Sequence, residues 1–206
     1  MKQHIRAQFA GTSAPADVVA EAAARLRPLF PVDDWMARRP MALAAVLVPL
    51  MDRVEGLTVL LTERSADLPD HPGQISFPGG RLESTDDGPV AAALREAAEE
   101  IGLPATSAEV IGYLPAHMTL TGFAVTPVVA IITPDFQFKL DAREVSQLIE
   151  IPLSFLTDSS NLEHEEREVA GRRLRLPVFN YGGHRVWGAT AIMLADFCLS
   201  LGKRAA

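Results

Sequence analysis

Three carboxylates and an arginine lie close together in the chain, in the order Arg95, Glu96, Glu99 and Glu100. On a helix, spacings of three and four residues place the three glutamates on one side, within an arc of about 100°. Like charges at these spacings repel, and a divalent cation would reverse the sign of the interaction. Magnesium prefers hard oxygen ligands, commonly carboxylates, waters and substrate phosphates. The glutamates therefore predict a metal site that acts on phosphate groups, with Arg95 holding Glu99 in place.

A glycine turn precedes this cluster. The segment Pro78-Gly79-Gly80 is typical of a turn or bulge at which the backbone approaches a phosphate closely. The glutamates alone would be interpreted as a solvated helix face with an ordinary surface ion pair. The turn favours the functional interpretation, and it makes Gly79 and Gly80 candidate substrate-binding residues.

The composition narrows the class of ligand. The chain has 206 residues, of which 48% are hydrophobic and 22% charged, and these values suit one sizeable globular domain. Its net charge of −7 argues against a nucleic-acid partner, because such binding needs a basic face that neutralises phosphates. An anionic small molecule would need local arginine or lysine side chains, or a bound cation. We expect a small-molecule nucleotide as the partner.

Few features of the sequence indicate the cellular compartment of the protein. The one cysteine, Cys198, cannot form an internal disulfide, which is typical of a reducing compartment. The first residues lack the apolar core of a secretory signal. The longest apolar region, 189–201, is shorter than the roughly 20 residues of a bilayer span. We expect a cytoplasmic protein without a membrane partner, and the sequence does not decide between a monomer and a homodimer.

The carboxylates must be positioned by a helix. Hydrophobic periodicity predicts this helix from Pro89 to Ile101, and Gly102 is expected to end it. The predicted buried stripe consists of Val90, Leu94, Ala97 and Ile101. On the same helical wheel the three glutamates lie on the side away from this stripe.

Other apolar runs surround this helix. Helices are expected over 16–29 and 187–201, the latter capped by Gly202, and a short one over 141–149. Strands are expected over 42–50, 57–62, 110–114 and 123–133. Strands and helices without regular βαβ alternation predict an α+β fold. We expect residues 1–39 to form an N-terminal extension with a packing helix, and residues 40–206 to form the main domain.

The segment from Gly80 to Leu103 resembles the Nudix box, written G-x5-E-x7-R-E-U-x-E-E-x-G-U, where U is a bulky apolar residue. It departs from the box by an Asp at the middle acidic position, one extra residue before the arginine, and the small Ala97 at the first U. The role of Asp86 is therefore open. The resemblance implies that residues 40–206 form a Nudix hydrolase domain, an α/β/α sandwich with a mixed β-sheet. It also implies a Mg²⁺-dependent pyrophosphohydrolase, with Mn²⁺ as the alternative ion.

The segment upstream of the box, from Leu60 to Gly80, is similar to the signature of coenzyme A pyrophosphatases within this family. The lengthened box with Asp is usual in that branch, and further matches lie at Thr119–Phe123 and Val186–Ala191. The resemblance implies hydrolysis of the diphosphate of coenzyme A, releasing adenosine 3′,5′-bisphosphate and 4′-phosphopantetheine. Metal held by Glu96, Glu99 and Glu100 would bridge the diphosphate oxygens.

Three further residues are candidates for the site. Arg64 follows a strand end and would bind a phosphate with two hydrogen bonds, the alternative being an ion pair with Glu63 or Asp67. His71 either contacts the substrate or only caps a turn. The catalytic base is either a box glutamate or a carboxylate beyond the box, for which Glu144 is the candidate. Its alternative role is a solvated charge on a helix.

Two other functions compete with this hypothesis. The same metal site would serve ADP-ribose, a dinucleotide, another nucleoside diphosphate derivative or a nucleoside triphosphate, and the upstream signature argues against these substrates. A Nudix-fold nucleotide-binding module without turnover is the alternative of a different class. The intact glutamates argue against it, because a module without catalysis has no need for three repelling carboxylates.

Overall fold

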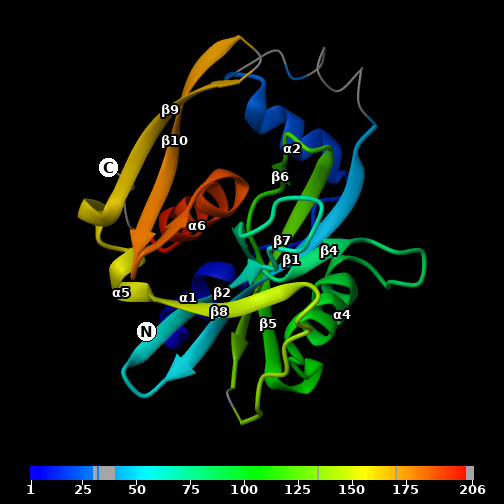
Figure 1. The fold of residues 1–206 in the computed structure, drawn as a ribbon, viewed down its shortest axis with the longest axis vertical. Helices are drawn as coiled ribbons and strands as arrows, with labels where there is room; N and C mark the ends of the chain where they lie inside the picture. The colour runs from blue at the N-terminus through cyan, green and yellow to red at the C-terminus, as the bar shows by residue number, and fades with distance from the viewer. Residues whose placement is uncertain (30–31, 33–39, 134, 170, 203–206) are drawn as a thin grey trace.

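The two apolar runs at the start of the main domain form the centre of a mixed β-sheet (Figure 1). In the computed structural model, which describes residues 1–29, 32, 40–133, 135–169 and 171–202, β1 (Ala42–Arg53) pairs antiparallel with β2 (Gly56–Arg64). β1 also pairs in parallel with β7 (Phe123–Ile132). These strands are rich in valine, leucine, isoleucine and alanine, as expected where both faces of a sheet are covered.

The remaining strands extend this sheet and add a second one. The main order is β3-β2-β1-β7-β5, with β4 paired to β1, β6 to β7 and β8 to β2. The added strands are β3 (Ile75–Ser76), β4 (Gly79–Arg81), β5 (Ala108–Tyr113), β6 (His117–Met118) and β8 (Val145–Pro152). A separate antiparallel sheet consists of β9 (Leu162–Val169), β10 (Arg172–Tyr181) and β11 (His184–Val186).

Helices cover both faces of the main sheet (Figure 1). They are α1 (Lys2–Phe9), α2 (Val18–Leu26), α4 (Pro89–Ile101), α5 (Leu153–Leu156) and α6 (Gly188–Ser200), with short 3-10 helices at Ala105–Ser107 and Ser159–Asn161. In the described part of the chain, no helix is long and apolar enough to cross a membrane.

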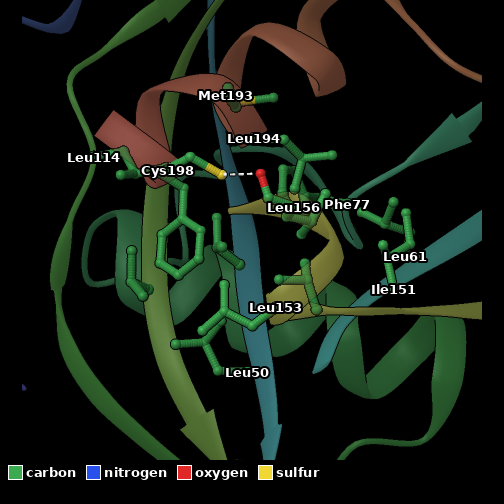
Figure 2. Packing of buried hydrophobic residues seen from close by; sticks show 14 of the residues in the cluster. Leu50, Leu61, Phe77, Leu114, Ile151, Leu153, Leu156, Met193, Leu194 and Cys198 are labelled. Atoms are coloured by element: carbon green, nitrogen blue, oxygen red, sulfur yellow. Dashed lines mark hydrogen bonds between the residues drawn. The ribbon is translucent and has the colours of Figure 1, made fainter. Parts of the chain in front are cut away.

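Strand β1 links the two halves of the core, because alternate residues point to opposite faces of a sheet. Ala45 and Leu47 pack with α4 on one face, whereas Val48 and Leu50 pack with α1 and α6 on the other. In Figure 2, Leu50 lies in the second half of the core, below α6 and close to Leu153. The result is the expected α+β fold, an α/β/α sandwich around a mixed sheet.

The N-terminal segment packs into this core. Ile5 and Phe9 of α1 are buried, and the Phe9 ring stacks on Phe197 of α6 with the ring centroids 5.9 Å apart. The predicted helix over 16–29 is present as α2, capped by Asp17, whose side chain accepts a hydrogen bond from the Ala20 amide. Helix α1 was not predicted, because only two of its eight residues are buried and its sequence is mostly polar.

The short helix predicted over 141–149 is wrong. In its place the structure has a turn, in which Asp141 accepts hydrogen bonds from the backbone and side chain of Arg143, and then strand β8. Ile149 and Ile151 are buried and lie opposite Leu61 and Val59 of β2. β-Branched side chains at alternating positions pack well in a sheet, and the partner strand decides between helix and strand for such a short run.

The final helix was predicted correctly. Trp187 is the N-cap of α6, and Gly202, with φ of 72°, follows its end. The thiol of Cys198 donates a hydrogen bond to the carbonyl oxygen of Leu156, at 3.3 Å, as Figure 2 shows. Burial raises the pKa of this thiol to about 12, so Cys198 is a packing residue.

Candidate active site

Helix α4 positions the carboxylates, and its ends are fixed by local sequence. Pro89 begins the helix, and because a backbone N–H at this position would have no partner within the helix, the proline loses no hydrogen bond. Gly102 ends it, because a left-handed φ of 67° lets its N–H donate to the carbonyls of Ala97 and Ala98. Ile101 is fully buried beneath the helix, in the half of the core that α4 shares with β1 and β7. The acidic residues of α4 are thus held at a fixed position beside the sheet.

Glu100 is buried, although the helical wheel predicted that all three glutamates face away from the apolar stripe. The residue is 7% exposed, and among the described residues its Oε2 has no hydrogen-bond partner. Burial, followed by repulsion from Glu96 and Glu144, raises the pKa of Glu100 to about 8, while the backbone N–H of Gly79 and the charge of Arg64 act in the opposite direction. A buried carboxylate oxygen without a partner is costly, and a divalent cation would satisfy it.

Glu96 lies against the glycines of β4. A Cβ atom at Gly80 would be 2.3 Å from Oε1 of Glu96, so only glycine leaves room for this carboxylate. Gly79 has a φ of 153°, and a Cβ atom there would be 2.4 Å from the carbonyl oxygen of Ala45. The predicted glycine turn is therefore a short strand, paired with β1, and its glycines allow close approach to β1 and α4.

Arg95 binds the acidic residues around it. Its Nε and Nη2 donate to the two carboxylate oxygens of Asp86, both at 3.0 Å, and Nη1 donates to Glu96 at 3.0 Å and to Glu99 at 3.3 Å. Asp86 also accepts a hydrogen bond from the Glu83 amide, and these contacts lower the pKa of Asp86. The predicted contact with Glu99 is present, but that side chain is 61% exposed. Asp86, whose role was open, is the main partner of Arg95.

Glu144 approaches the same carboxylates from the turn before β8. Its backbone carbonyl accepts a hydrogen bond from the Ser65 amide at 2.8 Å, which ties the turn to the end of β2. Burial is the main cause that raises the pKa of both Glu96 and Glu100, and the negative charge of Glu144 adds to the rise. The structure thus brings Glu144 close to these two residues, from a turn and not from a helix.

The donor set fits a divalent cation, although side-chain movement would be needed to surround one. Within residues 1–29, 32, 40–133, 135–169 and 171–202, no three His, Cys, Asp or Glu side chains are placed to hold an ion as they lie. The observation that favours a cation is the unpartnered Oε2 of Glu100 beside two further negative charges. Oxygen donors of this kind suit Mg²⁺ or Mn²⁺.

A cavity of about 750 Å³ borders the glycine strand, within the range of roughly 300–1,000 Å³ typical of small-molecule sites. All four predicted substrate-binding residues line it, namely Arg64, His71, Gly79 and Gly80. Residues 119–121 and 187–190, from the two downstream segments singled out in the sequence, line it as well. Three segments far apart in the chain therefore meet at one cavity.

Arg64 is the last residue of β2, and His71 lies in the loop that follows it; both line the cavity. The Nε of Arg64 donates to the carbonyl oxygen of Asp70 at 3.3 Å, and in the described part of the chain Arg64 forms no salt bridge. The alternative pairing with Glu63 or Asp67 is thus not realised. His71 has a left-handed φ of 55°, which fits the turn that it was expected to form.

Sequence reasoning missed the other walls of the cavity. They are formed by Ala22, Arg25, Leu26 and Leu29 in or next to α2, by His117 of β6, and by Val169, Leu174, Arg175, Leu176 and Pro177 of β9 and β10. The helical periodicity of residues 16–29 was the one signal that pointed to any of them. Nothing in the sequence pattern connected α2 or the β9–β10 hairpin to the glycine strand.

A model of the NUDIX domain matches residues 41–170, which is more than half of the chain. The chain belongs to the Nudix family. Its Arg95 to Gly102 segment, glycine strand and carboxylates occupy this matched region, and the protein is a Nudix pyrophosphohydrolase that acts on nucleoside diphosphate derivatives. Nudix hydrolases generally use divalent metal ions such as Mg²⁺.

Two bacterial relatives that are similar in sequence are also named as Nudix hydrolases. The Nudix hydrolase NudL of Enterobacter sp. (strain 638) is 42% identical over 161 residues, covering 78% of this chain and 83% of that protein. NudL of Escherichia coli (strain K12) is 41% identical over 162 residues, with the same coverage. Among solved structures, an Ap4A hydrolase of C. elegans is 20% identical, with a TM-score of 0.47 over 54% of this chain and 80% of that one.

Gly80→Ala is expected to lower metal-dependent kcat about 100-fold, because the new Cβ atom displaces the Glu96 carboxylate by an ångström or more. The fold should survive, since the far end of a flexible side chain can move away. Steady-state kinetics and circular dichroism measure the two effects. The matched control is Gly11→Ala, where no atom lies within 4 Å of the added Cβ. Wild-type kcat in Gly80→Ala would show that the position of Glu96 is unimportant.

His117→Gln is expected to reduce the loss of stability in acid. Burial, and then the charge of Arg25, lowers the pKa of His117 to about 4 from 6.5, so the folded state favours the neutral ring. This contribution is complete above pH 6.5 and is lost as the pH falls towards 4, amounting to roughly 2 kcal/mol by pH 4.5. Urea denaturation at pH 7 and 4.5 measures it, with the exposed His4→Gln as control. An identical pH dependence in His117→Gln and wild type would contradict the assignment.

Proposed function

We propose that the protein hydrolyses the diphosphate of coenzyme A, or of a coenzyme A derivative, to adenosine 3′,5′-bisphosphate and 4′-phosphopantetheine. The observation that carries this proposal is the meeting of three segments at one cavity. Residues 60–80, 119–123 and 186–191 resemble coenzyme A pyrophosphatases, and each contributes to the cavity lining. The Nudix box by itself does not distinguish coenzyme A from ADP-ribose or a dinucleotide.

The metal would be held by Glu96, Glu99 and Glu100. Mg²⁺, with Mn²⁺ as the alternative, supplies a Lewis acid that neutralises charge on the diphosphate and makes water more acidic. Among the three ligands, Glu100 has an oxygen without a hydrogen-bond partner in the described part of the chain, and Glu96 is positioned by Arg95 and by the space at Gly80.

Residues other than the metal ligands bind the substrate and transfer the proton. Arg64, which lines the cavity and forms no salt bridge within the described residues, binds phosphate oxygens through its guanidinium. The backbone of Gly79 and Gly80 allows the diphosphate to approach β4 closely. Glu144, on the turn beside Glu96 and Glu100, accepts the proton of the attacking water as general base. Attack in line with the leaving oxygen then breaks the phosphoanhydride bond.

We assign this reaction to the cytoplasm. The proposal is supported by Cys198, the single cysteine of the chain, which is a buried thiol.

Coenzyme A is expected to be the best substrate in a panel that also contains ADP-ribose, a dinucleotide and a nucleoside triphosphate. Purified protein is incubated with each compound and Mg²⁺, and the products are identified by mass spectrometry. Adenosine 3′,5′-bisphosphate and 4′-phosphopantetheine should appear, and EDTA should stop their formation. A higher kcat/KM for ADP-ribose than for coenzyme A would refute the substrate assignment and leave the Nudix chemistry intact.

Glu100→Gln is expected to lower kcat at least 100-fold while the fold is retained. The amide has nearly the same shape, but it lacks the charge that holds a divalent cation. Metal-dependent kinetics and a thermal melt measure the two properties. Glu55→Gln, on the exposed turn between β1 and β2, is the matched control and should keep wild-type kcat. Full activity in Glu100→Gln would remove this residue from the mechanism.

A further inference from the structure

Besides Arg64 and the two glycines, which are proposed to meet the phosphates, the cavity has walls of apolar side chains. These walls come from three elements outside the box, and their side chains are Leu26 and Leu29 near the end of α2, Leu174 and Leu176 of β10, and Ile192 and Met193 of α6. Figure 1 shows α2, the β9–β10 hairpin and α6 gathered on the side of the molecule away from α4. Transfer of aliphatic groups from water into such surroundings is favourable. This part of the cavity is thus suited to a hydrocarbon chain.

One polar side chain is buried in these walls. His117 of β6 is 6% exposed and lines the cavity, and its imidazole forms no hydrogen bond with any residue of the described ranges. Burial keeps the ring neutral, so it has one N–H donor and one acceptor nitrogen. A buried polar group is normally hydrogen-bonded. The imidazole therefore has the capacity for a hydrogen bond with a bound molecule.

The charges nearby do not suit a second phosphate deep in the cavity. Both oxygens of Asp196 accept hydrogen bonds from Nη2 of Arg25, at 2.9 and 2.7 Å, so the charge of this arginine is already neutralised. Arg175 also lines the cavity, but it is exposed on the hairpin. The group that enters this part should be uncharged.

A nucleobase is a poorer match, because bases are commonly bound by stacking on a free aromatic face. The guanidinium groups of Arg167 and Arg185 lie over the ring of Trp187, at 4.5 and 5.9 Å from the ring centroid. The guanidinium of Arg81 lies 5.9 Å from the ring centroid of Phe123. These aromatic rings of the cavity thus already have cationic partners.

We propose that the apolar part of the cavity binds an uncharged, flexible aliphatic arm of the substrate, and that His117 hydrogen-bonds an amide or carbonyl group along it. The inference rests on the proposed function, in which this arm is the pantetheine chain. It assigns substrate selection to α2, β6, α6 and the β9–β10 hairpin, whereas α4 and β4 carry the chemistry. His117 and Ile192 are then specificity-determining residues.

The two halves of the substrate can be tested separately by titration calorimetry with 4′-phosphopantetheine and adenosine 3′,5′-bisphosphate. Ile192→Trp fills the apolar part and should raise the Kd for 4′-phosphopantetheine at least tenfold, with the Kd for the bisphosphate unchanged. Leu199→Trp is the matched control, because it places the same side chain at a position of α6 that is 49% exposed and outside the cavity lining. It should bind both compounds as wild type does.

A second variant covers the case in which Ile192→Trp fails to fold. His117→Ala should raise the Kd for 4′-phosphopantetheine roughly three- to tenfold, and His117→Gln should restore part of the loss, as expected for one hydrogen bond. Unchanged 4′-phosphopantetheine binding in both Ile192→Trp and His117→Ala would overturn the inference. A selective loss of bisphosphate binding would also overturn it, because the nucleotide would then occupy this part.

Turnover distinguishes failure of the inference from failure of the proposed function. Loss of 4′-phosphopantetheine binding in Ile192→Trp, together with no cleavage of coenzyme A by wild type, would support the arm site and reject the reaction. Cleavage of coenzyme A with equal kcat/KM by wild type, Ile192→Trp and His117→Ala would support the reaction and reject the arm site.

Discussion

The proposed active site depends on a carboxyl group that the fold buries with one oxygen lacking a hydrogen-bond partner among the described residues. Glu100 is on the sheet-facing side of α4, where alanine and isoleucine side chains pack against β1 and β7. Its Oε2 accepts no hydrogen bond among the described residues, and Glu96 and Glu144 add negative charge beside it. Such an arrangement is unfavourable in the protein alone. A divalent cation would make it favourable, once side chains move to surround the ion.

Close backbone approach makes this arrangement sterically possible. Strand β4 lies so near β1 and α4 that neither Gly79 nor Gly80 can carry a side chain without displacing Ala45 or Glu96. Arg95 completes the arrangement, because its paired contact with Asp86 fixes the guanidinium that binds Glu96 and Glu99. The glycines and the arginine therefore act through the carboxylates that they position.

The proposed catalytic residues and the residues proposed to select the substrate belong to different parts of the fold. The carboxylates belong to α4 and to the turn before β8, whereas much of the cavity wall comes from α2, the β9–β10 hairpin and α6. Nudix chemistry requires the first set to keep its geometry, but the second set can change its side chains and so alter the substrate that fits. This separation explains why a box match identifies the reaction more readily than the substrate.

The sequence by itself determined the helix of residues 89–101, the apolar strands of β1, β2 and β7, and the side chains of the box, since local periodicity and glycine positions encode these features. Tertiary structure decided the rest. Residues 145–152 form a strand because β2 offers an edge to pair with, and Glu100 is buried because β4 approaches α4. The partnership of Arg95 with Asp86 and the convergence of α2, β10 and α6 arise from long-range contacts, which a pattern of neighbouring residues does not contain.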